Sequence, residues 1–349
     1  MSTTYRAVAW NPHKRRYDIV AGGLLLVFLV VFLGVQATLR RELTIETLLI
    51  RALAAAAFML LNIILCIGPL ARLNRRFLPL LYNRRHLGVM MFTLALAHGV
   101  FSIVQFHSAG TLNPLVSVLV GNARYTTISH IPFQPFGLAA LIILFLMAAT
   151  SHDFWLHNLT APVWKALHMG VYLAYALIVL HVIFGVLQGE ASPLLASALC
   201  GGVLTVFTLH SLAARQEARL DREKESLRID GFEDVCSVAD IPEKRAVVRC
   251  LSGERVAVFR YDGQVSAISN VCQHQNGPLG EGRIVNGCVV CPWHGYEYLP
   301  DTGASPPPFT EKVPTFDVRV VAGRVLVHPQ PHPPGTRVQP AMLDVARRA

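Results

Sequence analysis

The chain has 349 residues, of which 53% are hydrophobic and only 15% are charged, with a net charge of +9. A soluble globular domain carries about 25% charged residues, so this composition excludes an ordinary soluble protein and places part of the chain in lipid. The basic residues stand beside apolar runs and form no aromatic-interleaved patch, so we expect no nucleic-acid partner.

Six apolar runs of about 18 residues or more are long enough to be transmembrane helices. They cover residues 19–37, 45–68, 87–106, 133–150, 164–187 and 192–212. The fourth run is the weakest, because Pro132 and Pro135 stand at its start. We therefore predict a six-helix transmembrane bundle over residues 19–212, preceded by a cytoplasmic N-terminal tail at residues 1–18.

Lys and Arg residues are concentrated in the loops on one side of these runs. That side holds the basic stretches at residues 14–16, 72–85, 165 and 215–224. The other side carries only Arg40, Arg41 and Arg124. By the positive-inside rule, we expect a multi-pass protein of a bacterial inner membrane with both termini in the cytoplasm and the lipid bilayer as its first partner.

The sequence changes character after residue 212. Residues 213–229 are charged and favour a helix, which predicts a helical linker. From residue 230 the hydrophobic period falls toward two, and Asp262-Gly263 between two short strands is typical of a hairpin turn. We expect a small all-β domain over residues 230–330 and, because of its proline-rich and then polar composition, a disordered tail over 331–349.

Two pairs of metal-binding side chains lie in this β domain. Cys272-x-His274 is followed, after sixteen residues, by Cys291-x-x-His294. Two cysteines and two histidines can hold zinc, or they can hold the two irons of a [2Fe–2S] cluster, where one iron takes both thiolates and the other both imidazoles. Zinc fingers usually pair Cys-x-x-Cys with His-x-x-x-His, so the mixed order favours the cluster.

Residues 230–328 resemble the Rieske [2Fe–2S] ferredoxin-type domain. The resemblance is carried by Cys-x-His, by Cys-Pro-Trp-His-Gly and by three downstream prolines at 306–308. At positions 276 and 296 this chain has Asn and Tyr, where Rieske proteins of quinol-oxidising complexes carry an extra disulfide, so it is more similar to Rieske ferredoxins and oxygenase domains. The resemblance implies that a [2Fe–2S] cluster is bound by Cys272, His274, Cys291 and His294.

Four histidines mark the third and fifth apolar runs. Histidine is costly in lipid and usually has a function there. His98 and His181 lie inside these runs, and His86 and His168 lie at their cytoplasmic mouths. With the motif Arg-Arg-x-Leu-Gly, this spacing resembles the ferric reductase-like transmembrane family over residues 15–212, whose members hold b-type haem between histidines of these two spans.

The resemblance implies one b-type haem, with His98 on one side and His181 or His168 opposite. A second haem held by His86 and His168 is the open alternative. On an ideal helix, residues thirteen apart differ by roughly 140° in direction. His168 and His181 therefore need helix tilt or a distorted turn between them, unless one of them is not a ligand.

The β domain stands where ferric reductases carry their flavin and nicotinamide domains. We therefore expect an oxidoreductase of the electron-transfer kind, without FAD or NAD domains and without catalytic side chains of its own. It would pass single electrons between a cytoplasmic cluster and membrane haem. Its partners would be a soluble reductase or oxygenase and a quinone, ferric or periplasmic acceptor. The alternative is a membrane-anchored Rieske ferredoxin or a redox-sensing module without catalytic turnover.

Overall fold

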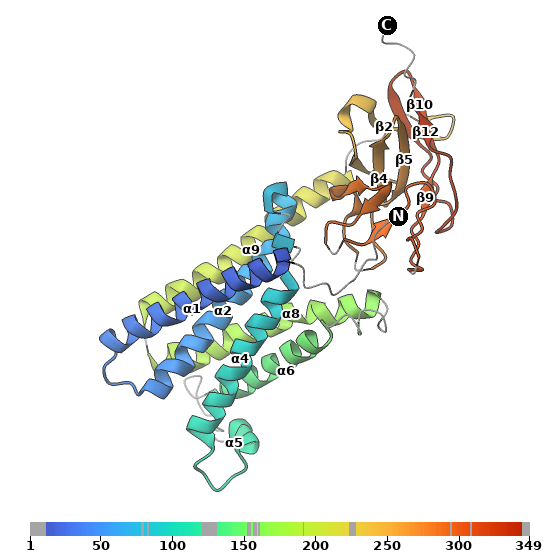
Figure 1. Ribbon diagram of the computed structural model, residues 1–349. Coiled ribbons are helices and arrows are strands. Elements are labelled where there is room, and N and C mark those ends of the chain that lie inside the picture. The colour runs from blue at the N-terminus through green and yellow to red at the C-terminus, as the bar shows by residue number, and fades with distance from the viewer. Residues whose placement is uncertain are drawn as a thin grey trace. The chain divides into compact units, whose positions relative to one another are not determined.

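The computed structural model describes residues 12–77, 80–81, 84–120, 131–151, 155, 159, 161–190, 192–222, 228–274, 276–293, 295–307 and 309–343. The chain divides at Leu212 into two compact units, one before this residue and one from it to the C-terminus. Helices make up the first unit, and the second contains all the strands of the described residues (Figure 1).

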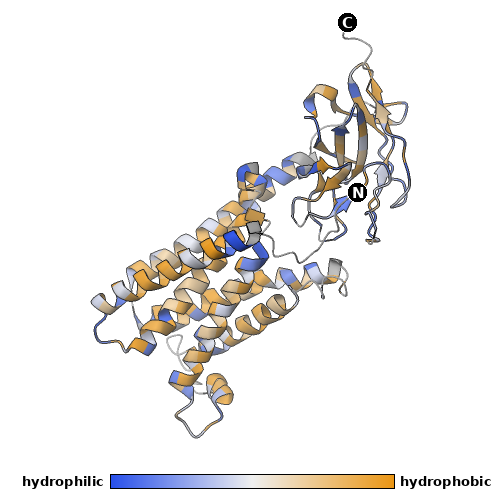
Figure 2. Ribbon diagram, in the orientation of Figure 1, coloured by the Kyte–Doolittle hydropathy of each residue, from blue (hydrophilic) through white to orange (hydrophobic). Residues whose placement is uncertain are grey.

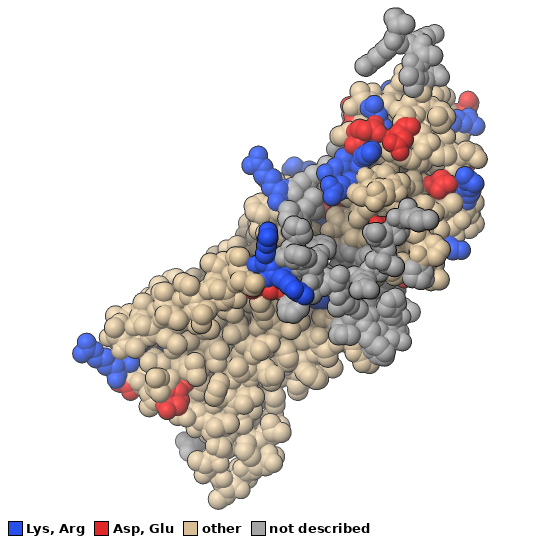
Figure 3. All heavy atoms as spheres, viewed as in Figure 1, with Lys and Arg blue, Asp and Glu red and all other residues tan. Residues whose placement is uncertain are grey.

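Long apolar helices build the first unit, and most of their length is orange in Figure 2, interrupted by paler and blue turns. On the face seen in Figure 3, charged atoms lie near the ends of this unit and its middle shows none. The helices are α1 (Pro12–Leu39), α2 (Ile45–Leu73), the 3-10 helix η1 (Arg75–Phe77), α4 (Arg84–His107), α5 (Pro114–Val120), α6 (Gln134–Ala149), α8 (Ala161–Val182), the π-helical turn η3 (Ile183–Leu187) and α9 (Pro193–Arg222).

The expected count of six spanning helices is not confirmed. Among the described residues, five helical stretches are long and apolar enough to cross a membrane: Arg15–Leu39, Ile45–Leu73, Arg84–His107, Val163–Leu187 and Pro193–Arg219. The fourth expected span is the apolar helix α6, which has only 16 residues. Pro135 stands in its first turn, where proline is well tolerated, and 16 residues rise only about 24 Å, against a hydrocarbon core of about 30 Å.

The helix α2 is the most deeply buried helix of the first unit. Its buried face combines alanines with leucines and isoleucines, and it packs against α1 and α4. Small side chains allow helix backbones to approach closely, which is how helices associate in lipid. α6 packs in turn against α4 and α8. These contacts bring the histidine-bearing helices α4 and α8 into one bundle.

The second unit is built from three antiparallel sheets of short strands. Their orders are β1-β2-β11-β10, β12-β5-β4-β3 with β9 beside β5, and β6-β7-β8. The strands are β1 (Arg228–Ile229), β2 (Phe232–Ser237), β3 (Arg245–Leu251), β4 (Glu254–Tyr261), β5 (Gln264–Ser269), β6 (Arg283–Val285), β7 (Cys288–Val290), β8 (Glu297–Tyr298), β9 (Thr315–Phe316), β10 (Val318–Val321), β11 (Arg324–Val327) and β12 (Ala341–Met342).

The hairpin turn predicted at Asp262-Gly263 is confirmed. It joins β4 to β5, and both residues have positive φ angles, of 44° and 74°. Two such angles are the requirement of a type I′ turn, whose twist matches that of the strands. The prediction therefore rested on a local backbone requirement that this dipeptide meets.

The expectation of a disordered tail over residues 331–349 is wrong for residues 331–343. The amide of His332 donates to the Thr315 carbonyl at 2.9 Å, that of Val338 to Asp301 at 2.8 Å, and β12 pairs with β5. Proline-rich composition predicts low helix and strand content, but tertiary hydrogen bonds to an exposed sheet edge can still order such a segment. Residues 344–349 lie outside the described part.

Candidate metal and haem sites

The first cysteine-histidine loop leaves the end of β5 and returns on itself within five residues. The amide of Asn276 donates to the carbonyl of Cys272 at 2.7 Å, and the amide of Cys272 donates to Gly277 at 2.9 Å. Asn276 has φ of +57°, the left-handed conformation that asparagine tolerates better than most residues. This turn holds the side chain of Cys272 inward, where only 1% of the residue is exposed.

The second loop repeats the same construction after β7. The amide of Gly295 donates to the Cys291 carbonyl at 2.9 Å, and the amide of Cys291 donates to Tyr296 at 2.7 Å. Gly295 takes the left-handed conformation with φ of +73°. Cys291 is 2% exposed, so both thiols are buried by two loops of matching geometry. All seven cysteines of the chain lie in the described residues, and none of them forms a disulfide.

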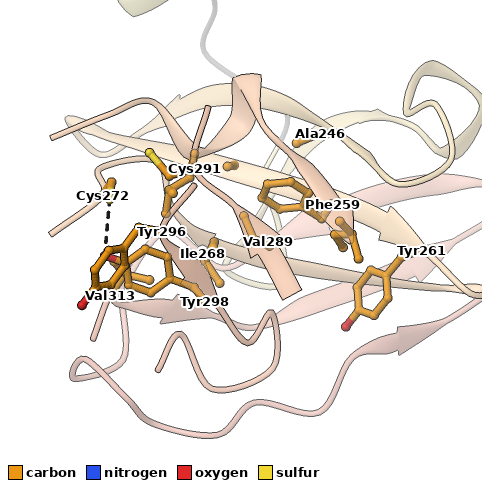
Figure 4. Close-up of a cluster of buried hydrophobic side chains, with 13 residues drawn as sticks. Ala246, Phe259, Tyr261, Ile268, Cys272, Val289, Cys291, Tyr296, Tyr298 and Val313 are labelled. Carbon is orange, nitrogen blue, oxygen red and sulfur yellow. Dashed lines mark hydrogen bonds between the residues drawn. The ribbon is translucent and has the colours of Figure 1, made fainter. Parts of the chain in front are cut away.

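The two loops approach each other closely at Gly277. A Cβ atom at this position would lie 2.7 Å from Sγ of Cys291 and 3.2 Å from the ring of Trp293. Only glycine therefore permits the backbone of the first loop to reach the thiol of the second. Figure 4 shows Cys272 and Cys291 at the same end of a core of buried side chains.

Tyr298 of β8 contacts the first thiol. Its hydroxyl lies 3.4 Å from Sγ of Cys272 and accepts a hydrogen bond from the amide of Gln273 at 3.1 Å. A cysteine that ligates iron is a thiolate without a proton, so with a cluster bound the phenol would be the donor of this hydrogen bond, which the dashed line in Figure 4 marks. Burial, and then the adjacent Cys272, raise the pKa of Tyr298, so the phenol stays a donor.

The first histidine of the motif is held by an aromatic group. The ring of His274 stacks on Tyr296 with centroids 4.9 Å apart and planes at 12°. The ring of Phe309 packs in turn against Tyr296, with centroids 4.9 Å apart. The hydroxyl of Tyr296 donates to the Glu311 carboxylate. The remaining predicted ligand, His294, lies outside the described residues.

The residues of the two loops fit a [2Fe–2S] cluster. Each iron of a Rieske centre takes only two protein ligands. The described residues contain no group of three or more His, Cys, Asp or Glu side chains around one metal position. A Rieske centre does not require such a group. The two buried thiols on facing loops are donors that such a cluster needs, and the Tyr298 hydroxyl contacts one of their sulfurs. Gly277 leaves the space for the cluster, because a side chain there would block the approach of the two loops.

The histidines of the helical unit share one hydrogen-bond pattern. Nδ1 of His98 donates to the Ile50 carbonyl at 3.1 Å, and Nδ1 of His181 donates to Phe133 at 2.9 Å. An imidazole that donates from Nδ1 to a carbonyl presents Nε2 as the free lone pair, which is the usual arrangement of a histidine metal ligand. A carbonyl oxygen can only accept a hydrogen bond, so Nδ1 of each ring carries the proton.

The structure brings His98 and His181 together. Their ring centroids are 6.3 Å apart, with the planes at 81°. Two imidazoles that ligate one metal ion from opposite sides, each at about 2 Å, have centroids about 6 Å apart. A Cβ atom at Gly137 of α6 would lie 2.7 Å from Nδ1 of His181, so this glycine makes the space for the ring. The pair therefore fits the axial ligands of a haem.

His168 and His86 have other neighbours. The ring of His168 stacks on Trp164 at 3.7 Å, its Nδ1 donates to the Trp164 carbonyl, and its buried Nε2 accepts no hydrogen bond from the described residues. Nδ1 of His86 lies 2.9 Å from both carboxylate oxygens of Asp18 in α1. The π-helical turn η3 follows His181, so it does not account for the difference in direction between His168 and His181.

Sequence reasoning missed several residues of these sites. Gly277 lies between the two halves of the motif, and Tyr298 follows the second half. A glycine three residues after a predicted ligand indicates a close backbone approach, so Gly277 could have been predicted. Gly137 has no comparable signal, because its role depends on a ring from another helix.

These features define the class of protein: an iron–sulfur protein of the Rieske type joined to a histidine-bearing transmembrane unit. The Rieske [2Fe-2S] domain matches residues 231–317, and the ferric reductase like transmembrane component matches residues 52–179. The chain belongs to the Rieske [2Fe–2S] family, and it carries the ferric reductase-like transmembrane domain in the same polypeptide.

Known relatives match the Rieske part. The anthranilate 1,2-dioxygenase ferredoxin subunit of Burkholderia cepacia is 32% identical over 95 residues, which are 26% of this chain and 86% of the relative. Cholesterol 7-desaturase nvd 1 of Ciona intestinalis is 42% identical over 66 residues, 18% of this chain and only 14% of that protein. Among solved structures, the ferredoxin of carbazole 1,9a-dioxygenase from Nocardioides aromaticivorans IC177 is 27% identical with a TM-score of 0.28, over 29% of this chain and 100% of the other. Together the two domains support a membrane electron-transfer function.

Proposed function

We propose that this protein passes single electrons between a Rieske [2Fe–2S] cluster and a b-type haem in the membrane. The cluster ligands are Cys272, His274, Cys291 and His294. The haem ligands are His98 and His181, and the observation that carries this choice is their ring separation of 6.3 Å with both Nδ1 atoms engaged by carbonyls. When bound, each group can accept and release one electron.

The protein residues keep both groups in a low-dielectric environment and fix their ligands. Cys272 and Cys291 are held inward by the matched turns, and the Tyr298 hydroxyl donates a hydrogen bond to Sγ of Cys272. His98 and His181 are each fixed by a carbonyl from a different helix or helix end. Because these ligands are fixed, they need not reorient when the charge of the bound group changes by one electron. Fixed ligands therefore favour fast electron transfer.

A second haem, held by His168 and His86, is supported by one further observation. Nε2 of His168 is buried and accepts no hydrogen bond from the residues that the structure describes. A buried unpaired nitrogen costs about 1–3 kcal/mol, and a metal ion would satisfy it. Nδ1 of His86 faces the Asp18 carboxylate, which would leave Nε2 of this ring for the same role.

We propose that both termini lie in the cytoplasm, which requires α6 to cross the bilayer. Contacts at its two ends support the crossing. The Phe133 carbonyl, at the start of α6, accepts from His181 of α8, and the Thr150 carbonyl, at the end of α6, accepts from Nε1 of Trp164 in α8 at 3.1 Å. Those two α8 residues are about 25 Å apart along the helix, so α6 follows α8 over most of a bilayer.

The proposed partners follow from this orientation. On the cytoplasmic side the cluster would exchange electrons with a soluble reductase or oxygenase, in line with the ferredoxin subunits among the relatives. On the other side the haem would exchange electrons with a quinone, ferric iron or a periplasmic protein.

The test is an optical and paramagnetic redox titration of the purified full-length protein. We expect reduced α, β and Soret bands of bis-histidine haem together with the signal of a reduced [2Fe–2S] cluster. The change His98→Ala should abolish the haem bands and keep the cluster signal, His294→Ala should do the reverse, and His210→Gln in α9 is the matched control. A cluster without haem would favour a membrane-anchored ferredoxin, and redox cycling without turnover toward any acceptor would favour a sensor.

A further inference from the structure

A three-residue ion network lies at the end of the helical unit where α1 stops and α2 starts. Arg51 stands in the second turn of α2, within a stretch long enough to span a membrane. Its guanidinium pairs with Oε1 of Glu190, and NH2 of Arg40 lies 3.1 Å from Oε2 of the same carboxylate. A cation at this depth is costly unless it is paired. Glu190 therefore joins three separate segments through one carboxylate.

Two of these segments, the one that contains Arg51 and the one that contains Glu190, each contact or carry one imidazole of the proposed haem pair. Ile50, the residue before Arg51, supplies the carbonyl that accepts from Nδ1 of His98. On the other side, the amide of Glu190 donates to the Val186 carbonyl at 2.8 Å, within the π-helical turn that begins two residues after His181. The Arg51–Glu190 pair thus connects the backbone that orients one ring to the helix end that carries the other.

π-Helical turns are uncommon and are frequent at functional sites. This turn also packs closely against Phe133, the residue whose carbonyl holds His181, because a Cβ at Gly185 would lie only 3.0 Å from the Phe133 ring. The end of α8 is therefore held by the bundle through α6 and by Glu190 through α2. Removal of one attachment should change the ring pair without unfolding the bundle.

We propose that Glu190 is a positioning residue that, through its ion pair with Arg51, sets the relative orientation of His98 and His181. The inference rests on the proposed function, since it assigns to Glu190 the geometry of the haem ligands. The Arg51 hydrogen bond also lowers the pKa of Glu190, which keeps the carboxylate charged and the pair intact at neutral pH.

The test compares Glu190→Gln, Arg51→Gln and the double variant in the full-length protein, with Glu42→Gln as the control. Glu42 lies beside Arg40 at 3.7 Å but is well exposed and contacts neither ring-bearing segment. The readouts are the g values of the oxidised low-spin haem, which report the angle between the imidazole planes, and the rate of haem loss to an apoprotein acceptor. We expect changed g values and haem loss about threefold to tenfold faster, which is less than the roughly 10–100-fold effect of residues that contact a metal ligand directly, because Glu190 acts through Arg51 and the backbone.

A role as one unit predicts that the double variant resembles each single variant, because either change already breaks the pair. Additive effects, g values unchanged in Glu190→Gln, or an equal change in Glu42→Gln would overturn the proposal. If Glu190→Gln fails to insert, Glu190→Asp keeps the charge, shortens the reach and should give the same spectral change.

A third readout separates this proposal from the proposed function. In protein labelled with ¹⁵N-histidine, the Nδ1 signal of His98, assigned by its absence in His98→Gln, reports the hydrogen bond to Ile50 with or without haem. If wild-type protein holds no haem, the proposed function fails, and the shift of this signal in Glu190→Gln still decides the positioning role. An unshifted signal rejects that role.

Discussion

The hydroxyl of Tyr298 should tune the potential of the cluster, and the change Tyr298→Phe removes only that hydroxyl. Its oxygen lies 3.4 Å from Sγ of Cys272, and the hydroxyl would donate a hydrogen bond to the ligating thiolate. The reduced cluster carries one more electron than the oxidised one, so a donor at a sulfur stabilises the reduced form more. Hydrogen bonds to the sulfurs are among the factors that set such potentials. We therefore expect the variant to have a lower potential.

The magnitude follows from the strength of one hydrogen bond to a charged group, about 1.5–3 kcal/mol. If about half of this value distinguishes the two redox states, the difference is about 0.8–1.5 kcal/mol, and 1.4 kcal/mol corresponds to about 59 mV for one electron. The expected shift is therefore about 30–60 mV downward. The amide of Gln273 also loses its acceptor, so a modest loss of thermal stability should accompany it.

The assay is a dithionite titration followed by the paramagnetic signal of the reduced cluster. Tyr261→Phe is the matched control, because Tyr261 is a buried tyrosine of the same unit whose hydroxyl contacts Ser266 at 2.8 Å and no ligand. A shift of less than about 10 mV, an upward shift, or an equal shift in Tyr261→Phe would refute the assignment of the phenol proton to the sulfur.

Three further outcomes are expected. Gly137→Ala would place a methyl group 2.7 Å from the His181 ring, so haem content should fall, whereas Gly88→Ala, with no atom within 4 Å, should keep it in the same spectral assay. Removal of residues 331–349 breaks several backbone hydrogen bonds of about 1 kcal/mol each, so the cluster absorbance should be lost at a lower temperature. The folded-state pKa of Glu190 is lowered, so its ion pair contributes stability above the unfolded pKa of about 4.3 and loses it as pH falls through the lower folded value. The difference in melting temperature between wild type and Glu190→Gln should therefore shrink below about pH 4.

The sequence alone determined the features that depend on neighbouring residues. Apolar runs of sufficient length predict helices in lipid because every backbone group must be paired within the segment. The Asp262-Gly263 turn was predictable because two successive positive φ angles suit few dipeptides. The metal motif was predictable because its donors lie close together in each of two short loops.

Tertiary structure alone decided the features that join distant residues. The placement of the His181 ring, and not the His168 ring, beside His98 depends on how the bundle packs, and no spacing within one helix fixes it. The order of residues 331–343 depends on a sheet edge that only the folded domain presents. Glu190 meets Arg51 across 139 residues of sequence, since a charge in an apolar bundle is stable only where folding brings it a partner.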